Sequence, residues 1–287
     1  MDLRKTAFFI FAPCFLSCSS QPTPLKTVFD LPGQIKEASA LAYLPNTNVF
    51  WTLEDSGNDA VLFALDTNGA LRHKVNINKP NVDWEALTSD DRGNLYIGDF
   101  GNNDNDRENL MIYKINAEDL GKAGANVSVQ VNFYYPEQQE FPPKKSKRIF
   151  DAEAFFLHDN YFYVFTKNRS SNSDGTTQLY KIPNVAGNHA AKLMGSFTTC
   201  EAFRKCAVTD AAISGDGKKM ALLSNAKVWL FEDFSGDAFL KGKVTEIDLH
   251  DNSQKEGICF KGSEIFICDE KDKHSGGNMY QLTIDNQ

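Results

Sequence analysis

The sequence lacks the short motifs that mark the common catalytic sites. It contains no G-x-S-x-G, no H-E-x-x-H, no P-loop and no G-x-G-x-x-G ahead of a helix. Its five histidines are scattered along the chain. Nucleophilic serine or cysteine catalysis therefore has no support in the sequence, and whether the chain is an enzyme stays open.

Basic residues are too few for the surface to bind a polyanion. The 30 Lys and Arg residues stand against 38 Asp and Glu, which gives a formal net charge of −8. This balance argues against a nucleic-acid partner, because there is no basic excess to neutralise phosphates. The one basic run, PPKKSKR at 142–148, is interpreted as a solvated loop.

Helical periodicity is also missing. Short runs of Val, Ile, Phe, Tyr and Trp are separated by Asn, Gly, Asp and Pro throughout the chain. Such runs are typical of short β-strands joined by turns. The sequence therefore predicts an all-β protein.

The first residues have the features of a bacterial lipoprotein leader. Arg4 and Lys5 precede an apolar stretch at 7–16 that is too short to span a bilayer. The stretch ends in FLSC, which resembles a lipobox, and Cys18 is the better lipidation candidate because Cys14 follows a proline. We therefore expect a signal peptide at 1–17, a tether at 18–24, and an envelope lipoprotein facing the periplasm or outer membrane. A plain signal peptide is the alternative.

Export decides how the other cysteines are interpreted. Cys200 and Cys206 flank the segment EAFRK and could form a disulfide in an oxidising compartment. Cys259 and Cys268 lie on consecutive predicted strands, where a diagonal disulfide and two buried free thiols both remain open. Neither pair has the spacing of a zinc site.

One pattern occurs five times, at 37–55, 84–99, 152–167, 209–225 and 255–270. Each copy has a polar residue, one or two small residues, an apolar strand, a turn and a second apolar strand with a polar end. A third strand follows each pair, and a fourth follows in the first four units. This period predicts a five-bladed β-propeller. A six-bladed ring is the alternative, with a degenerate blade at 116–150 or 183–206.

The fifth unit stops at its third strand, where the chain ends. The missing strand can come from LKTVFDL at 25–31, ahead of the first unit. This closure would leave no exposed sheet edge. We therefore expect one monomeric propeller domain at 25–287.

Carboxylates recur where the first strand of each unit starts. The first strand of a blade lines the channel and the second runs back beside it, so starts and ends share one mouth. The starts are Ser39, Glu85, Glu153, Asp210 and Glu256, and the ends are Asp55, Asp99, Lys167, Asn225 and Asp269. Four acids near one axis would repel strongly, and a divalent cation removes that penalty. Oxygen ligands of mixed type suit Ca²⁺, so the five starts are predicted as metal ligands.

Long loops should surround the same mouth. They lie at 100–109, 168–178 and 270–277, and with the end of the third unit's second strand they bring four candidate cations, namely Arg107, Lys167, Arg169 and His274. Polar loops on a rigid scaffold are a common place for a binding site. These cations are predicted to hold a small anionic ligand.

The ordered set of strand starts resembles the central calcium ring of the calcium-activated nucleotidase (apyrase) family. The resemblance rests on WEALTSDDRGNLYIG, AEAFFLHDNYFYVF and KEGICF. It implies a five-bladed propeller and calcium ligation by Ser39, Glu85, Glu153 and Glu256. The family has serine where this chain has Asp210, and its acidic segment ahead of the first blade has no counterpart here. The same strand starts are also similar to phytase-like, lactonase-like and TolB-like propellers.

Two functions follow from these patterns. The first is a lipid-anchored binding or scaffold propeller in which calcium locks the blades and the loop-rich rim binds a partner protein or glycan. The second is a calcium-dependent hydrolase of phosphate-type or other anionic esters, with Glu153 or Asp99 as the base. The sequence names neither the substrate nor the partner.

Overall fold

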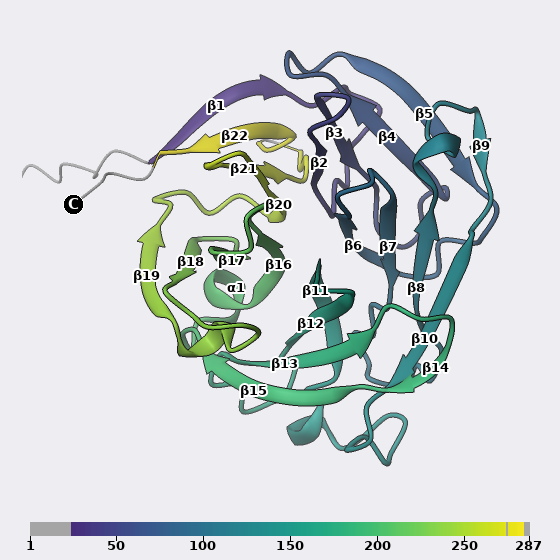
Figure 1. Cartoon of the computed structure of the whole chain (residues 1–287). Coiled ribbons are helices and arrows are strands. Elements are labelled where there is room, and N and C mark those ends of the chain that lie inside the picture. The colour runs from purple at the N-terminus through teal and green to yellow at the C-terminus, as the bar shows by residue number, and fades with distance from the viewer. Residues whose placement is uncertain (1–23, 274, 284–287) are drawn as a thin grey trace, which may run out of the picture.

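The computed structural model describes residues 24–273 and 275–283, and these form five antiparallel blades around a central channel. Figure 1 shows the blades around a centre that is bordered by β2, β6, β11, β16 and β20. The predicted five-bladed β-propeller is confirmed. The predicted leader, tether and Cys18, and also His274, lie outside the described residues.

Blades 1 and 2 each contain four antiparallel strands and a short fifth strand. Blade 1 is formed by β2 (Ala42–Leu44), β3 (Val49–Thr52), β4 (Val61–Leu65), β5 (Leu71–Ile77) and β9 (Gly124–Ala125). Blade 2 is formed by β6 (Trp84–Ser89), β7 (Leu95–Asp99), β8 (Leu110–Ile115), β10 (Val129–Tyr134) and β14 (Gly187–Ala190).

Blades 3 and 4 have four strands in sequence order. Blade 3 consists of β11 (Asp151–His158), β12 (Tyr161–Lys167), β13 (Thr176–Pro183) and β15 (Lys192–Thr198). Blade 4 consists of β16 (Val208–Ile213), β17 (Met220–Ser224), β18 (Lys227–Glu232) and β19 (Lys243–Asp248). Helical turns are short, at η1 (Ala117–Asp119), η2 (Lys145–Lys147), α1 (Phe203–Cys206) and η3 (Phe239–Lys241).

Blade 5 closes the ring in the predicted way. Its strands β20 (Lys255–Lys261), β21 (Glu264–Asp269) and β22 (Asn278–Leu282) are completed by β1 (Leu25–Asp30), which pairs antiparallel with β22. The two ends of the propeller are thereby hydrogen-bonded to each other, and the last blade has no missing outer strand.

The two segments considered for a sixth blade have another role. β9 and β14 are parallel strands that add to the outer edges of blades 1 and 2, next to β5 and β10. Each precedes the outer strand of the following blade in the sequence. The chain therefore reaches back to the preceding blade before it completes the next one, and the six-bladed alternative is wrong.

The core consists of five hydrophobic clusters, one between each pair of neighbouring blades. Trp51 and Trp84 pack between blades 1 and 2, Phe155 and Tyr180 between blades 2 and 3, and the remaining three interfaces are filled in the same way. Each blade buries both faces, which explains why the inner strands are apolar runs without alternation. The ring of blades holds the starts of the inner strands at one mouth.

Candidate functional site

The glutamates at the strand starts lie at irregularities in the ladders between first and second strands. The register shifts between Trp84 and Ala86, between Ala152 and Ala154, and between Lys255 and Gly257. The extra residues in these three bulges are Glu85, Glu153 and Glu256. A bulge re-aims the side chain of its extra residue, so three blades present a glutamate at equivalent positions around one mouth.

Blade 4 departs from the predicted alignment. Its register shift falls between Val208 and Asp210, so the residue that matches the glutamates is Thr209. The prediction that Asp210 shares their position is wrong by one residue. The buried Asp210 carboxylate instead accepts the backbone N–H groups of Ala211 and Ile258, both at 2.8 Å. It joins the inner strands of blades 4 and 5.

Ser39 is buried next to the isolated bridge that Ala38 forms with Glu54. Its hydroxyl donates to the carbonyl oxygen of Trp84 at 3.4 Å. Ser39 thus lies beside the start of β6, close in the fold to Glu85, as the shared mouth predicts. Its hydroxyl is used in a contact between blades 1 and 2.

Two acids and two cations form a buried network at the start of blade 3. Arg169 Nη2 lies 2.6 Å from Glu153 Oε1, and its Nε contacts Asp151. Lys167 Nζ lies 3.0 Å from Glu153 Oε2. Asp151 is fully buried and Glu153 is 2% exposed. We name these four residues the blade-3 clamp.

The charges within the blade-3 clamp shift the pKa values of its residues. Burial and the charge of Glu153 raise the pKa of Asp151 well above its usual value. Burial opposes ionisation of Glu153 too, but Lys167, Asp151 and Arg169 outweigh it and lower the pKa of Glu153. Burial would lower the pKa of Lys167, yet Glu153 and Glu256 raise it. Lys167 and Arg169 therefore neutralise the acids beside them, which makes both poor candidates for an anion site.

Arg107 is engaged in a similar way on blade 2. Its Nη2 lies 3.0 Å from Oδ1 of the fully buried Asp99, and its Nη1 donates to the carbonyl oxygen of Gly101 at 2.8 Å. The same Asp99 oxygen accepts the N–H of Asp83 at 3.2 Å. The guanidinium thus holds the loop after β7 in place. Asp99 and Glu153, the two candidate bases, are both bound by cations.

The structure brings further acids to the same mouth that the alignment of strand starts did not select. These are Glu37 and Asp55 on blade 1, Asp83 on blade 2 and Glu270 on blade 5. Together with Glu85 and Glu256 they form what we call the acidic mouth. None of these six carboxylates forms an ion pair within the part of the chain that the structure describes. A repeated sequence signal existed, because Asp83-Trp84-Glu85 and Asp151-Ala152-Glu153 share the pattern D-x-E.

A glycine allows two of these acids to approach each other. A Cβ atom on Gly101 would lie 2.4 Å from both Asp83 Oδ2 and Glu85 Oε1. Only a residue without a side chain leaves room for the two carboxyl groups on either side of this backbone. The carboxyl groups of Asp83 and Glu85 are hydrogen-bonded to each other.

Burial and mutual repulsion raise the pKa values of Asp55, Asp83, Glu85, Glu256 and Glu270. Burial, Glu37 and Asp83 raise the pKa of Asp55 to about 6. Burial is also the main cause for Glu256, whose pKa rises to about 7, and for Glu270, whose pKa rises to about 8. The pKa of Glu85 lies well above its usual value because of burial, Glu153 and Asp83. Ionisation of all these carboxyl groups at once is therefore unfavourable unless a cation compensates their charge.

The described acids of the mouth do not form a ready-made metal cage. Within residues 24–273 and 275–283, no group of three or more His, Cys, Asp or Glu side chains is arranged to hold a metal ion. The predicted ring of Ser39, Glu85, Glu153, Asp210 and Glu256 does not fit a cation as a set, because Ser39, Glu153 and Asp210 have other partners. Glu85 and Glu256 remain as candidate ligands.

The cysteines behave in two ways. Cys200 and Cys206 are joined by a disulfide bond, as the sequence predicts. The enclosed segment contains α1, and the ring of Phe203 packs 5.8 Å from the Arg169 guanidinium. The disulfide loop thus lies against the blade-3 clamp. Cys259 and Cys268 are buried free thiols, the second of the two readings left open by the sequence.

Comparison with known proteins supports the fold. No family model matches the sequence, and no curated protein matches it. A gluconolactonase from Xanthomonas campestris is similar in structure, with a TM-score of 0.51, 10% identity, and coverage of 90% of this chain and 89% of that chain. An aldose sugar dehydrogenase from Streptomyces coelicolor has a TM-score of 0.49 and 10% identity, over 90% of this chain and 96% of the other.

The five sheets define the chain as a five-bladed β-propeller, and at 10% identity the gluconolactonase shows a similar fold alone. Across the described residues, no helix has the length and apolar character needed to cross a membrane. The resemblance to calcium-activated nucleotidases stays a prediction.

Proposed function

We propose that this chain is an exported binding propeller whose acidic mouth binds a divalent cation of the calcium class. The observation that carries the proposal is the group of six carboxylates without ion-pair partners among the described residues, which lie at one mouth where the first strands start and the second strands end. Like charges held this close repel, and a bound cation relieves that repulsion.

The ligands we propose differ from the ring that the sequence predicts. Glu85 and Glu256 are retained from it, and Asp55, Asp83 and Glu270 join them because they share the same charge environment. No three of these side chains form a metal cage among the described residues, so we propose that they move toward the ion when it binds. Carboxylate oxygens on several separate loops suit Ca²⁺, which accepts six to eight oxygen ligands in flexible geometry. Mg²⁺ demands a tighter octahedral arrangement and fits such a mouth less well.

A binding role is favoured over hydrolysis of anionic esters. The candidate bases Asp99 and Glu153 are held by Arg107 and by the blade-3 clamp. The three described cations that were expected to hold an anionic ligand are engaged in the same ion pairs. A partner protein or glycan that approaches the long loops would therefore meet a mouth whose charge is set by the bound cation.

The cellular location that we propose for the protein follows from its sequence. Lipidation of Cys18 would tether the propeller to the bacterial envelope, and the Cys200–Cys206 disulfide is consistent with an oxidising compartment. Metabolic labelling with a fatty-acid analogue checks this step. Label that is lost in Cys18→Ser but kept in Cys14→Ser supports it, and equal label in both variants contradicts it.

Thermal denaturation with Ca²⁺, Mg²⁺ or chelator tests the cation site. A ligand at a hundred times its Kd adds about 2.7 kcal/mol to the native state, which for a domain of this size raises Tm by about 5–10 °C. We expect this shift with Ca²⁺ and a smaller one with Mg²⁺. Glu85→Gln and Glu256→Gln should remove it, and Glu118→Gln, on the exposed outer turn η1, should keep it. A Ca²⁺ shift that survives both inner substitutions rejects this site.

A further inference from the structure

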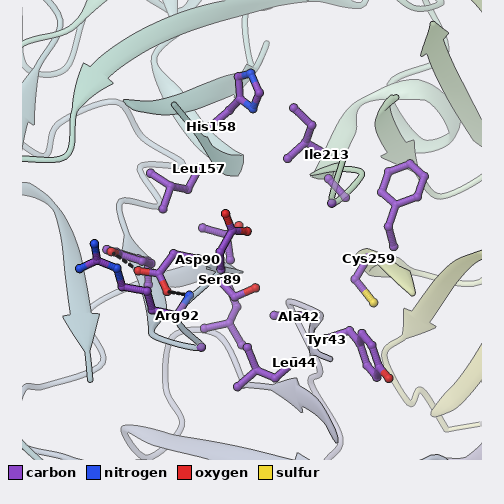
Figure 2. Close-up of a pocket in the computed structure, with 18 of the residues that line it drawn as sticks. Ala42, Tyr43, Leu44, Ser89, Asp90, Arg92, Leu157, His158, Ile213 and Cys259 are labelled. Atoms are coloured by element: carbon purple, nitrogen blue, oxygen red, sulfur yellow. Dashed lines mark hydrogen bonds between the residues drawn. The ribbon is translucent and has the colours of Figure 1, made fainter. Parts of the chain in front are cut away.

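The opposite mouth of the channel opens into a cavity of about 1030 Å³. It is lined by the ends of the inner strands β2, β6, β11, β16 and β20 and by the turns that follow them. The acidic mouth is formed by the starts of these strands, so the two features lie at opposite ends of the channel. Figure 2 shows this cavity as an open space ringed by side chains from all five blades, among them Leu44, Ser89, Leu157, Ile213 and Cys259. We name it the distal funnel.

The ionised groups of the distal funnel already have partners in the protein. Asp90 accepts four hydrogen bonds, from the N–H groups of Arg92 and Asn94 and from the side chains of Asn94 and Tyr96. Asp216 accepts the Ser214 hydroxyl at 2.7 Å and the N–H of Lys218 at 3.1 Å.

Of the other charged side chains in the lining, His158 contacts an acid, Lys114 lies over the Tyr96 ring and Arg92 points outward. His158 Nε2 lies 3.4 Å from Asp159. Figure 2 shows the Arg92 guanidinium pointing away from the open centre, beside Asp91 in the same turn. The carboxylates of Asp90 and Asp216 are already hydrogen-bonded within the protein, so a ligand in the distal funnel does not need to supply a cation to satisfy them.

Aromatic rings and backbone form the rest of the wall. Tyr43 and Phe260, from neighbouring blades, are partly exposed and line the cavity. The Tyr43 ring is held in place by Phe50, with ring centroids 5.1 Å apart, and its hydroxyl bonds Asn48 at 2.7 Å. A ring fixed by such contacts loses little side-chain entropy when a ligand packs on it.

Each inner strand is the last strand of its sheet, so one backbone edge faces the channel without a pairing strand. Ala42 on β2 and Ala211 and Ala212 on β16 line the funnel with small side chains. One N–H of this edge, that of Ile258, is bonded to Asp210. The wall therefore offers uncharged donors and acceptors together, which hydroxyl groups can match because each both donates and accepts.

We propose that the distal funnel is a second ligand site, which binds an uncharged, polyhydroxylated ligand of the saccharide class. The C–H face of a sugar ring would pack on Tyr43 and Phe260, and its hydroxyls would bond the backbone edge and polar side chains such as Ser89. The volume is that of a small-molecule site and admits one or two sugar rings. This site does not depend on cation binding at the acidic mouth.

Saturation-transfer NMR with neutral mono- and disaccharides tests the proposal, using glucose, galactose, mannose, N-acetylglucosamine, maltose and cellobiose in the presence of chelator. We expect saturable transfer to at least one sugar. Tyr43→Leu should weaken that binding about three- to tenfold, the usual worth of an aromatic contact. Tyr134→Leu, at an exposed tyrosine on the outer strand β10, should leave it unchanged.

A second pair of variants separates the funnel from the rest of the surface. Ser89→Trp fills the funnel from its wall and should abolish binding, whereas Ser196→Trp, on the exposed outer strand β15, should not. Circular dichroism and a cooperative melt confirm that each variant folds. The proposal is overturned if no sugar gives saturation transfer at high millimolar concentration, or if binding persists unchanged in both Tyr43→Leu and Ser89→Trp.

Discussion

Removal of Arg169 should destabilise the propeller strongly, because this side chain neutralises two buried acids at once. In Arg169→Gln the fully buried Asp151 loses its ion pair, and Glu153 keeps only Lys167. Breaking a buried ion pair from one side typically costs 3–5 kcal/mol. Lys167 remains, and the Arg169 side chain is itself 26% exposed, so we expect the lower end of this range, about 3 kcal/mol.

The assay is thermal denaturation in chelator, where about 3 kcal/mol corresponds to a fall in Tm of about 6–12 °C for a domain of this size. Arg72→Gln is the matched control, because Arg72 is 64% exposed and pairs with Asp66 at the surface. Such a pair contributes less than about 1 kcal/mol. The difference between the two variants should be clear in a single experiment.

The pH dependence and a rescue make the same prediction more specific. Because the pKa of Asp151 is raised, this residue takes up a proton earlier than an ordinary aspartate as pH falls and then no longer needs Arg169, so the loss should shrink. Asp151→Asn in the Arg169→Gln background removes the orphaned charge and should restore part of the stability. If Arg169→Gln lowers Tm no more than Arg72→Gln, or if Asp151→Asn only adds to the loss, the blade-3 clamp does not work as described.

Three further predictions concern the surroundings of the acidic mouth. Reduction of the Cys200–Cys206 disulfide removes a short loop constraint and should lower the free energy of unfolding by about 2 kcal/mol according to the loop-entropy relation. Reductant should therefore lower the Tm of the wild-type protein but not that of a Cys200→Ser/Cys206→Ser variant. Gly101→Ala should force the carboxyl groups of Asp83 and Glu85 apart and reduce the Ca²⁺-induced Tm shift, whereas Gly33→Ala, with no neighbour within 4 Å, should retain it. Without divalent cations, stability should fall as pH rises from about 5 to about 7. The cause is Glu256, whose pKa is about 7 in the native state, so that the native state keeps a proton which the unfolded state has already released. Urea titrations at each pH measure this slope, and Glu256→Gln should flatten it.

Much of the fold could be predicted because every blade repeats the same strand pattern. The closure by β1 followed from counting strands in the fifth unit, and the disulfide followed from the export signal and the six-residue spacing. Periodicity and counting depend on many residues at once, so they survive local irregularities.

The details of the site depend on single residues and could not be predicted as well from the sequence. In blade 4 the bulge falls at Thr209, and nothing in TDAAIS distinguishes that register from one centred on Asp210. The ion pairs of Glu153 with Lys167 and Arg169 depend on side-chain reach across the loop after β12. The distal funnel was not expected either, since turns between the first and second strands carry no unusual residues.

The most direct test of the acidic mouth is a crystal structure of the chain grown with Ca²⁺, measured alongside calorimetric titration of the same protein. We expect one saturable Ca²⁺ site, with carboxylate oxygens of Glu85 and Glu256 within about 2.3–2.6 Å of the ion. Titration of Glu85→Gln should then give no heat. If the wild-type protein gives no heat of binding and its crystals contain no ion, or if the ion lies away from these two glutamates, the acidic mouth is not the calcium site.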